Sequence, residues 1–190
     1  MLRATSFLAF AFTGLLFIGC NDLATAPELS SSDDAVGVKG ETSANALRGK
    51  AVTNFVAPLS GDEVVPSVDT DARGLAKFKL NKAGDELGYK LIVANIEAVL
   101  GAHIHMAPPG ENGGIVVFLF GDPFTDPVTV NGTLAEGTIT ASDVVGPNAG
   151  NFETLIEAMK AENTYVQVHT SENPPGEIRG QIDRGNGIRP

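Results

Sequence analysis

From Ala51 onward the chain is a succession of short apolar–polar segments separated by turns, and this pattern restricts its fold most. "LAKFKLN" alternates, with Ala76, Phe78 and Leu80 on one face, and "LGYKLIVANI" returns after a turn at 82–86. "APPGENGG", "GDPFTDP" and "SENPPGE" separate further strands, which we expect at 102–106, 115–120, 128–130, 133–140, 164–170 and 177–183. Strands at this spacing, without helices between them, indicate an all-β, antiparallel, Greek-key-like β-sandwich or barrel.

One segment, "NFETLIEAMKAEN", has a helical period instead. Its apolar residues stand at i, i+3, i+4 and i+7, which is one face of a helix: Phe152, Leu155, Ile156 and Met159. We therefore expect one short helix that covers an open end of the sandwich and contributes these four side chains to the core.

The N-terminal residues have the pattern of an export signal. An apolar run at 7–18 follows Arg3 and is too short to span a bilayer. It ends in "FIGC", which resembles a bacterial lipobox in which the cysteine is lipidated, with Phe17 where leucine is usual. We expect residues 1–19 to be a lipoprotein signal peptide and Cys20 to carry the lipid. The alternative is a plain secretory signal with an incidental cysteine.

The remaining chain divides into a tether, a domain and a tail. Residues 20–50 are small and polar, which predicts a flexible tether; 51–184 form the domain and 185–190 a C-terminal tail. The formal net charge is −10, and removing 1–19 takes away one base and no acid, leaving 12 Lys+Arg against 23 Asp+Glu, or −11. This balance argues against nucleic acid as a partner. We expect an exported protein in the cell envelope, anchored to the membrane by its lipid.

Two of the three histidines stand one residue apart, in "GAHIHM". Side chains alternate along a strand, so His103 and His105 share one face. The same alternation places His169 and Arg179 opposite the aliphatic residues of their own strands. The core-facing set is then Ile104, Val166, Val168 and Ile178.

Several blocks together resemble the CHRD domain, the module named after chordin and also found in bacterial exported proteins. They are "PLSGDEVVPSVDTDARGLAKFKL", "LGYKLIVANI", "GAHIHMAPPGENGGIVVFLF", "GTLAEGTIT" and "YVQVHTSENPPGEIRGQI", and they cover about Val52 to Asp183 in the expected order. The resemblance implies an extracytoplasmic β-sandwich. It implies no reaction, because a fold does not define a function.

A fainter resemblance concerns the copper/zinc superoxide dismutases. "LGAHIHMAPPGENGG" is similar to their Gly-x-His-x-His segment and "VQVHT" to a later copper-ligand strand. This resemblance implies a superoxide-dismutase-like sandwich with His103, His105 and His169 at three copper-ligand positions. The chain has no histidine for the bridging imidazolate or the zinc site and lacks the disulfide cysteines. These departures argue against dismutase activity of the usual kind.

Two interpretations of the histidines remain open. Three imidazoles on one face suit Cu(II), or less well Zn(II), with an open position for water or a substrate. Nitrogens within about 4 Å of one another would favour such a site, and binding should weaken below about pH 6.5, where protons compete. Alternatively, the histidines bond to carbonyls of the loops that follow His105 and His169 and fasten them.

Glu177 and Arg179 share a face at i and i+2. We favour a structural role, in which Arg179 pairs with a carboxylate or binds loop carbonyls. The alternative is a group that attracts anions beside a metal.

The sequence has no Gly-x-Ser-x-Gly, phosphate loop or Cys-x-x-Cys. We therefore expect a lipid-anchored, extracytoplasmic binding or envelope module without catalysis, with an unidentified protein or small molecule as partner. The alternative is a metal-binding protein, with copper favoured over zinc, that has weak redox activity.

Overall fold

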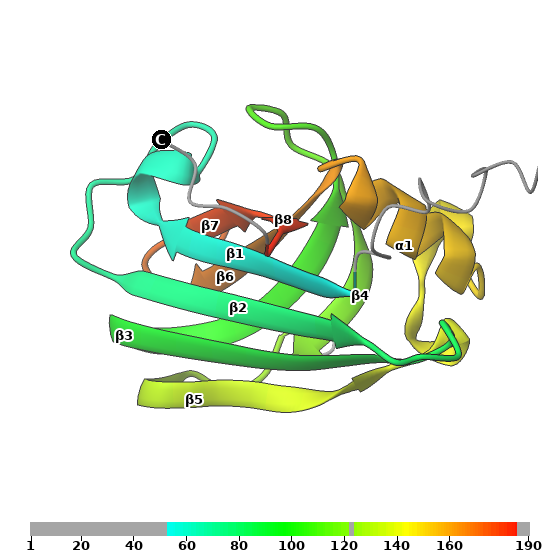
Figure 1. The fold of residues 1–190 in the computed structure, drawn as a ribbon. Helices are drawn as coiled ribbons and strands as arrows, with labels where there is room; N and C mark the ends of the chain where they lie inside the picture. Colours follow the sequence, from blue (N-terminus) through cyan, green and yellow to red (C-terminus); the bar gives the residue numbers. More distant parts are fainter. Residues whose placement is uncertain (1–52, 122–123, 186–190) are drawn as a thin grey trace, which may run out of the picture. The chain divides into compact units, whose positions relative to one another are not determined.

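The described part of the chain is built almost entirely from strands. The computed structural model describes residues 53–121 and 124–185. The strands are β1 Asn54–Ser60, β2 Arg73–Leu80, β3 Leu87–Met106, β4 Gly114–Phe120, β5 Val128–Ile139, β6 Thr164–Thr170, β7 Ile178–Gln181 and β8 Asp183–Arg184 (Figure 1). One α-helix, α1 Phe152–Lys160, and three 3-10 helices, η1 Gly61–Glu63, η2 Ala141–Asp143 and η3 Gly146–Asn148, complete the elements of these residues.

The predicted signal peptide, Cys20 and the tether lie outside the described residues, as do residues 186–190 of the predicted tail. Within the described ranges, no helix is long and apolar enough to cross a membrane.

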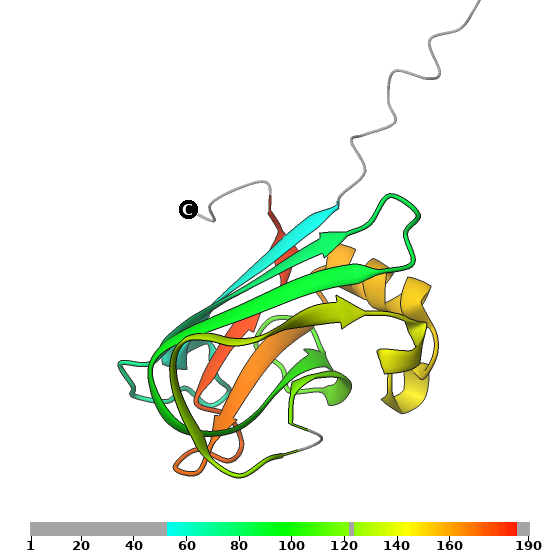
Figure 2. The same cartoon turned by 90° about the horizontal axis from the view of Figure 1, so that it is seen from below.

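The strands form a closed circuit of antiparallel pairs. β1 pairs with β2, β2 with β3, β3 with β6, β6 with β7, and β7 with β1. β4 and β5 add to β3, and β8 adds to β1. Figure 2 shows the strands wrapped around a common interior with α1 at one end. The prediction of an all-β antiparallel sandwich or barrel with one short helix is confirmed.

β3 is the strand that joins the two parts of the sheet. Its first half pairs with β2 and β5, and its second half pairs with β4 and β6. The strand bends between these halves, where Asn95 and Ala98 have φ of 54° and 48° and the pairing register shifts. The prediction of separate strands at 87–96 and 102–106 is therefore wrong, because the polar bend interrupts the apolar pattern without ending the strand.

Two other strand boundaries differ from the prediction. Two strands were predicted at 128–130 and 133–140, but β5 continues through Asn131 and Gly132, and Gly132, with φ of 138°, pairs with Val93. The segment predicted at 177–183 is divided into β7 and the short β8. β1 was not predicted, because Pro58 hides its alternation.

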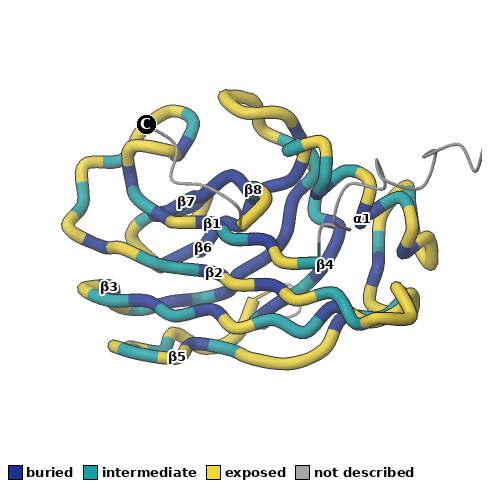
Figure 3. The backbone as a smooth tube through the Cα atoms, in the orientation of Figure 1, coloured by how far each residue is buried: buried dark blue, intermediate teal, exposed yellow. Residues whose placement is uncertain are grey.

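The core is formed by buried residues of the strands and of α1, and Figure 3 marks buried residues in dark blue along the backbone. Ile104, Val166, Val168 and Ile178 are all 0% exposed, which confirms the predicted core face. The four apolar residues of α1 are also buried and pack into the same core, as predicted. The helix begins after Asn151, whose side chain accepts a hydrogen bond from the Thr154 backbone N–H at 3.0 Å. Such an N-cap contributes about 1 kcal/mol to helix stability.

Both faces of β6 are buried along its whole length. One face carries Val166 and Val168 into the core. The opposite face carries Tyr165, Gln167 and His169, none of which is more than 5% exposed. Alternation alone separated these faces, but it did not reveal that the histidine face is covered as well.

Candidate metal centre

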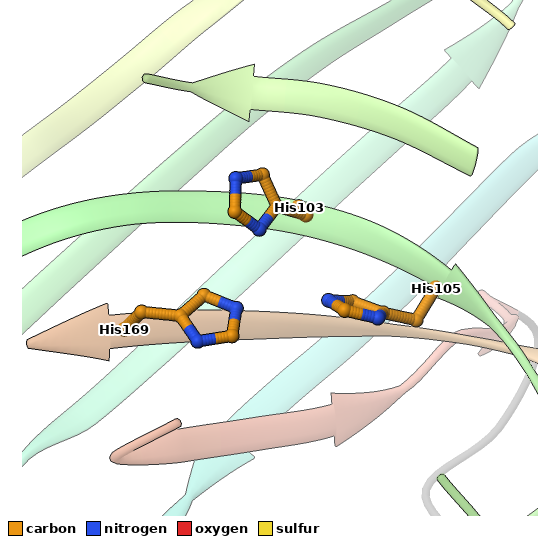
Figure 4. Close-up of side chains that lie close together, drawn as sticks. All are labelled: His103, His105 and His169. Atoms are coloured by element: carbon orange, nitrogen blue, oxygen red, sulfur yellow. The ribbon is translucent and has the colours of Figure 1, made fainter. Parts of the chain in front are cut away.

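The pairing of β3 with β6 brings the three histidines together. Gly101 is paired with His169 and His105 with Tyr165, so His169 lies diagonally across from His103. Figure 4 shows the three rings gathered beside one another, two from β3 and one from β6. Each residue offers one nitrogen such that the three nitrogens all lie within 4.8 Å of one another.

All three imidazoles are withdrawn from water. His103 is 0% exposed, His105 7% and His169 5%. Aromatic rings surround them: Phe118 is 5.2 Å from His103 between ring centroids, and Phe124 is 5.5 Å from His169. The cluster is therefore an enclosed group of nitrogen donors.

Backbone carbonyls orient two of the rings. His105 Nδ1 lies 2.9 Å from the Gly113 carbonyl oxygen, and His169 Nδ1 lies 2.8 Å from that of Pro174. Because a carbonyl only accepts, each Nδ1 carries the hydrogen, and the lone pair of the neutral ring is on Nε2. Within the described ranges neither Nε2 has a hydrogen-bond partner. This second-layer bonding is typical of histidines that bind metals.

Burial keeps these rings neutral. It lowers the pKa of His105 from 6.5 to about 4, against the opposing effect of the bond to Gly113, and the nearby His169 and Arg179 lower it further. Burial also lowers the pKa of His169, opposed by its bond to Pro174. Neutral imidazole is the form that coordinates a metal ion.

The nitrogen spacing is close to that of a metal site but slightly wider than about 4 Å. Nitrogens bound at about 2.0–2.1 Å to one tetrahedral ion are about 3.4 Å apart. Nitrogens spread over as much as 4.8 Å must therefore approach one another by up to about 1.4 Å around such an ion. Rotation of the three side chains about their own bonds would supply this approach, and with it the residues fit a three-nitrogen metal site.

The same bonds fasten two loops. The loop after β3 is held by His105 at Gly113 and by Asn112, whose side chain donates to the Val65 carbonyl at 2.7 Å. The loop after β6 is held by His169 at Pro174 and by Gln167, which donates to the Pro175 carbonyl at 2.6 Å. The loop-fastening contacts therefore exist, and they leave Nε2 of both histidines available.

Arg179 and Glu177 are not brought together. Across the described part of the chain, no ion pair within 4.0 Å joins them. The Glu177 carboxylate accepts hydrogen bonds from the hydroxyls of Thr70 and Thr170 at 2.8 and 2.7 Å. Arg179, 1% exposed, donates to the side-chain oxygens of Asn112 and Gln181, both at 3.3 Å. Burial lowers its pKa, and Tyr165 and Glu63 oppose this.

Sequence reasoning missed the residues that surround the histidines. Tyr165 stacks on His105, and Phe118 and Phe124 lie against His103. Alternation places Tyr165 on the histidine face, and this signal was present in "TYVQVHT". No pattern along the chain indicates the two phenylalanines, because they reach the site from other parts of the sheet and its loops.

Comparison with known proteins gives one family. The sequence matches the family model described as the CHRD domain over residues 55–182, about two thirds of the chain. No curated protein matches it.

Proposed function

The chain belongs to the CHRD domain family, and we propose that it is an exported binding module that holds one transition-metal ion on His103, His105 and His169. Family membership suggests a binding module of the extracellular type. The metal is inferred from the histidines themselves.

The convergence of three imidazole nitrogens within 4.8 Å carries this proposal. Histidines that only fasten loops have no need to direct their ring nitrogens toward one common point. Here the bonds to Gly113 and Pro174 direct Nδ1 toward the loops and leave Nε2 of His105 and His169 for an ion. The carbonyl bonds therefore support the metal site as its second layer.

Copper is the favoured ion and zinc the second choice. Imidazole suits both, and the general order of affinity places Cu(II) above Zn(II). Three protein nitrogens leave a fourth position for a water molecule or another small ligand. All three rings are buried, so a large substrate could not reach an ion bound to their nitrogens. This supports metal binding rather than turnover of a substrate.

The N-terminal sequence supports a place in the cell envelope. The apolar run at 7–18 precedes Cys20, the single cysteine of the chain. A lipid on this residue would anchor the domain to a membrane through the polar segment 21–50.

Metal content tests the proposal. The chain is purified with Cys20→Ser, which removes the one thiol that would bind metal elsewhere. Separate samples are then loaded with Cu(II) and with Zn(II), dialysed and analysed for metal per chain. We expect one ion in this background and a large loss with His103→Ala. Lys77→Ala, which changes an exposed residue of β2, should keep the full content. Equal, low metal in all three proteins would refute the proposal.

A further inference from the structure

Tyr165 lies face to face with one of the three histidines. It is paired across β6 and β3 with His105, and the two rings are nearly parallel, with centroids 4.9 Å apart and planes at 10°. Tyr165 is 1% exposed. The tyrosine ring therefore restricts the plane in which the His105 ring can lie.

A guanidinium holds the tyrosine from the side of β7. β3 and β7 flank β6 on opposite sides, and Arg179 of β7 places Cζ 3.6 Å from the centroid of the Tyr165 ring. Within the described ranges no carboxylate lies within 4.0 Å of its nitrogens. The ring face and two side-chain amide oxygens therefore stabilise this buried charge in close contact, and Glu63 does so from farther away.

The same two residues reach the loop that orients His105. The Tyr165 hydroxyl accepts a hydrogen bond from the Gly113 N–H at 3.0 Å, and the carbonyl of Gly113 accepts from His105 Nδ1 at 2.9 Å. Arg179 donates a hydrogen bond to the side-chain oxygen of Asn112, the residue before Gly113. The plane of the His105 ring and the position of its hydrogen-bond partner therefore both depend on the buried pair of Tyr165 and Arg179.

We propose that Tyr165 is a positioning residue of the metal site. It fixes the plane of the His105 ring by stacking, and it holds Gly113, whose carbonyl orients that ring. Arg179 in turn supports the tyrosine. This inference rests on the proposed function. It goes beyond packing, because an aliphatic residue would fill the same space without defining a ring plane. Loss of a second-layer partner weakens metal binding by about 10–100-fold.

Two substitutions separate the two contributions. Tyr165→Phe keeps the stacking ring and removes the hydroxyl bond to Gly113. Tyr165→Leu removes both and leaves an apolar side chain. Val168→Ala, on the opposite face of the same strand and 0% exposed, is the matched control. It lowers stability through a core cavity, and its side chain lies in the hydrophobic core rather than on the face of β6 that carries Tyr165 and His169.

The measurement is Zn(II) affinity by competition with a chromogenic chelator, together with the electron paramagnetic resonance spectrum of the Cu(II)-loaded chain. We expect Tyr165→Leu to raise the Kd by about 10–100-fold and to broaden a single copper signal into several. Tyr165→Phe should fall between Tyr165→Leu and wild type. Val168→Ala should melt earlier and keep the wild-type Kd and spectrum.

The outcomes distinguish the two claims. Wild-type affinity and spectrum in Tyr165→Phe and in folded Tyr165→Leu would overturn the positioning role and leave the metal site intact. An equal loss of affinity in Val168→Ala would also overturn it, since the effect would then follow stability alone. Failure of the wild-type chain to bind either Zn(II) or Cu(II) would refute the proposed function itself.

Discussion

The histidines of this domain are buried bases, and a buried base makes folding sensitive to protons. The pKa of His105 lies at about 4 in the folded chain, against 6.5 in an ordinary environment, and that of His169 is lowered as well. Below about pH 6.5 the unfolded chain therefore binds more protons than the folded chain. Stability present at neutral pH is lost as the pH falls from about 6.5 toward 4.

We predict that the metal-free protein is less stable at pH 5 than at pH 7.5. His105 alone should lower the free energy of unfolding by about 2 kcal/mol across this interval, and His169 adds to the loss. Urea denaturation at the two pH values measures the difference, and His105→Leu should show a smaller one. Equal stability at both values in the wild-type chain would show that His105 is not held neutral by burial.

Sequence reasoning predicted which residues share a face but not their environment. Alternation grouped His103, His105 and His169 correctly, since the period of a strand depends only on the backbone. It placed proton competition for a metal below about pH 6.5, the value for an exposed imidazole. Burial lowers the pKa of the His105 ring to about 4, so this ring takes up a proton only at lower pH. The loop that follows His105 and the Tyr165 ring of β6 lie against this imidazole, and the alternation of side chains along β3 does not encode this packing.

At the scale of elements, Gly113 connects the loop after β3 to His105 through its carbonyl. A Cβ on Gly113 would lie 1.9 Å from the Met106 carbonyl oxygen, so any larger residue must displace the backbone. Its carbonyl is the one that orients His105. A Cβ added to the neighbouring Gly114 would meet no atom within 4 Å.

We predict that Gly113→Ala weakens both the fold and the metal site, whereas Gly114→Ala does neither. The first change should lower the melting temperature and raise the Kd for Zn(II), because the loop shifts away from His105. Thermal unfolding and Zn(II) titration of the paired variants measure the effects. Identical behaviour of the two alanine variants would mean that the Gly113 contact is not needed.

The strand pattern was predictable to the extent that each strand is regular. Segments such as Thr164–Thr170 keep strict alternation, and their position and faces were predicted. β3 was divided in two because Asn95 and Ala98 bend it. β1 was missed because Pro58 falls within it. In each case tertiary pairing sustains a strand through residues that locally disfavour one.

At the scale of the whole molecule, the N-terminal prediction concerns Cys20, which lies outside the described residues. We predict that Cys20→Ser moves the protein from the detergent-extracted membrane fraction to a soluble or unprocessed form, since the acyl chains that hold it are lost. Fractionation with mass analysis of the N-terminus measures this. A correctly processed Cys20→Ser protein that stays in the membrane fraction would refute lipid anchoring.

The central claim is that His103, His105 and His169 together hold one metal ion. Calorimetric titration of Zn(II), which has no redox chemistry, into the wild-type chain and His169→Ala tests it most directly. We predict one ion per wild-type chain and a loss of that binding in His169→Ala, because two nitrogens do not replace a set of three. Equal, weak binding by both proteins would contradict the claim and leave the histidines with the loop contacts alone.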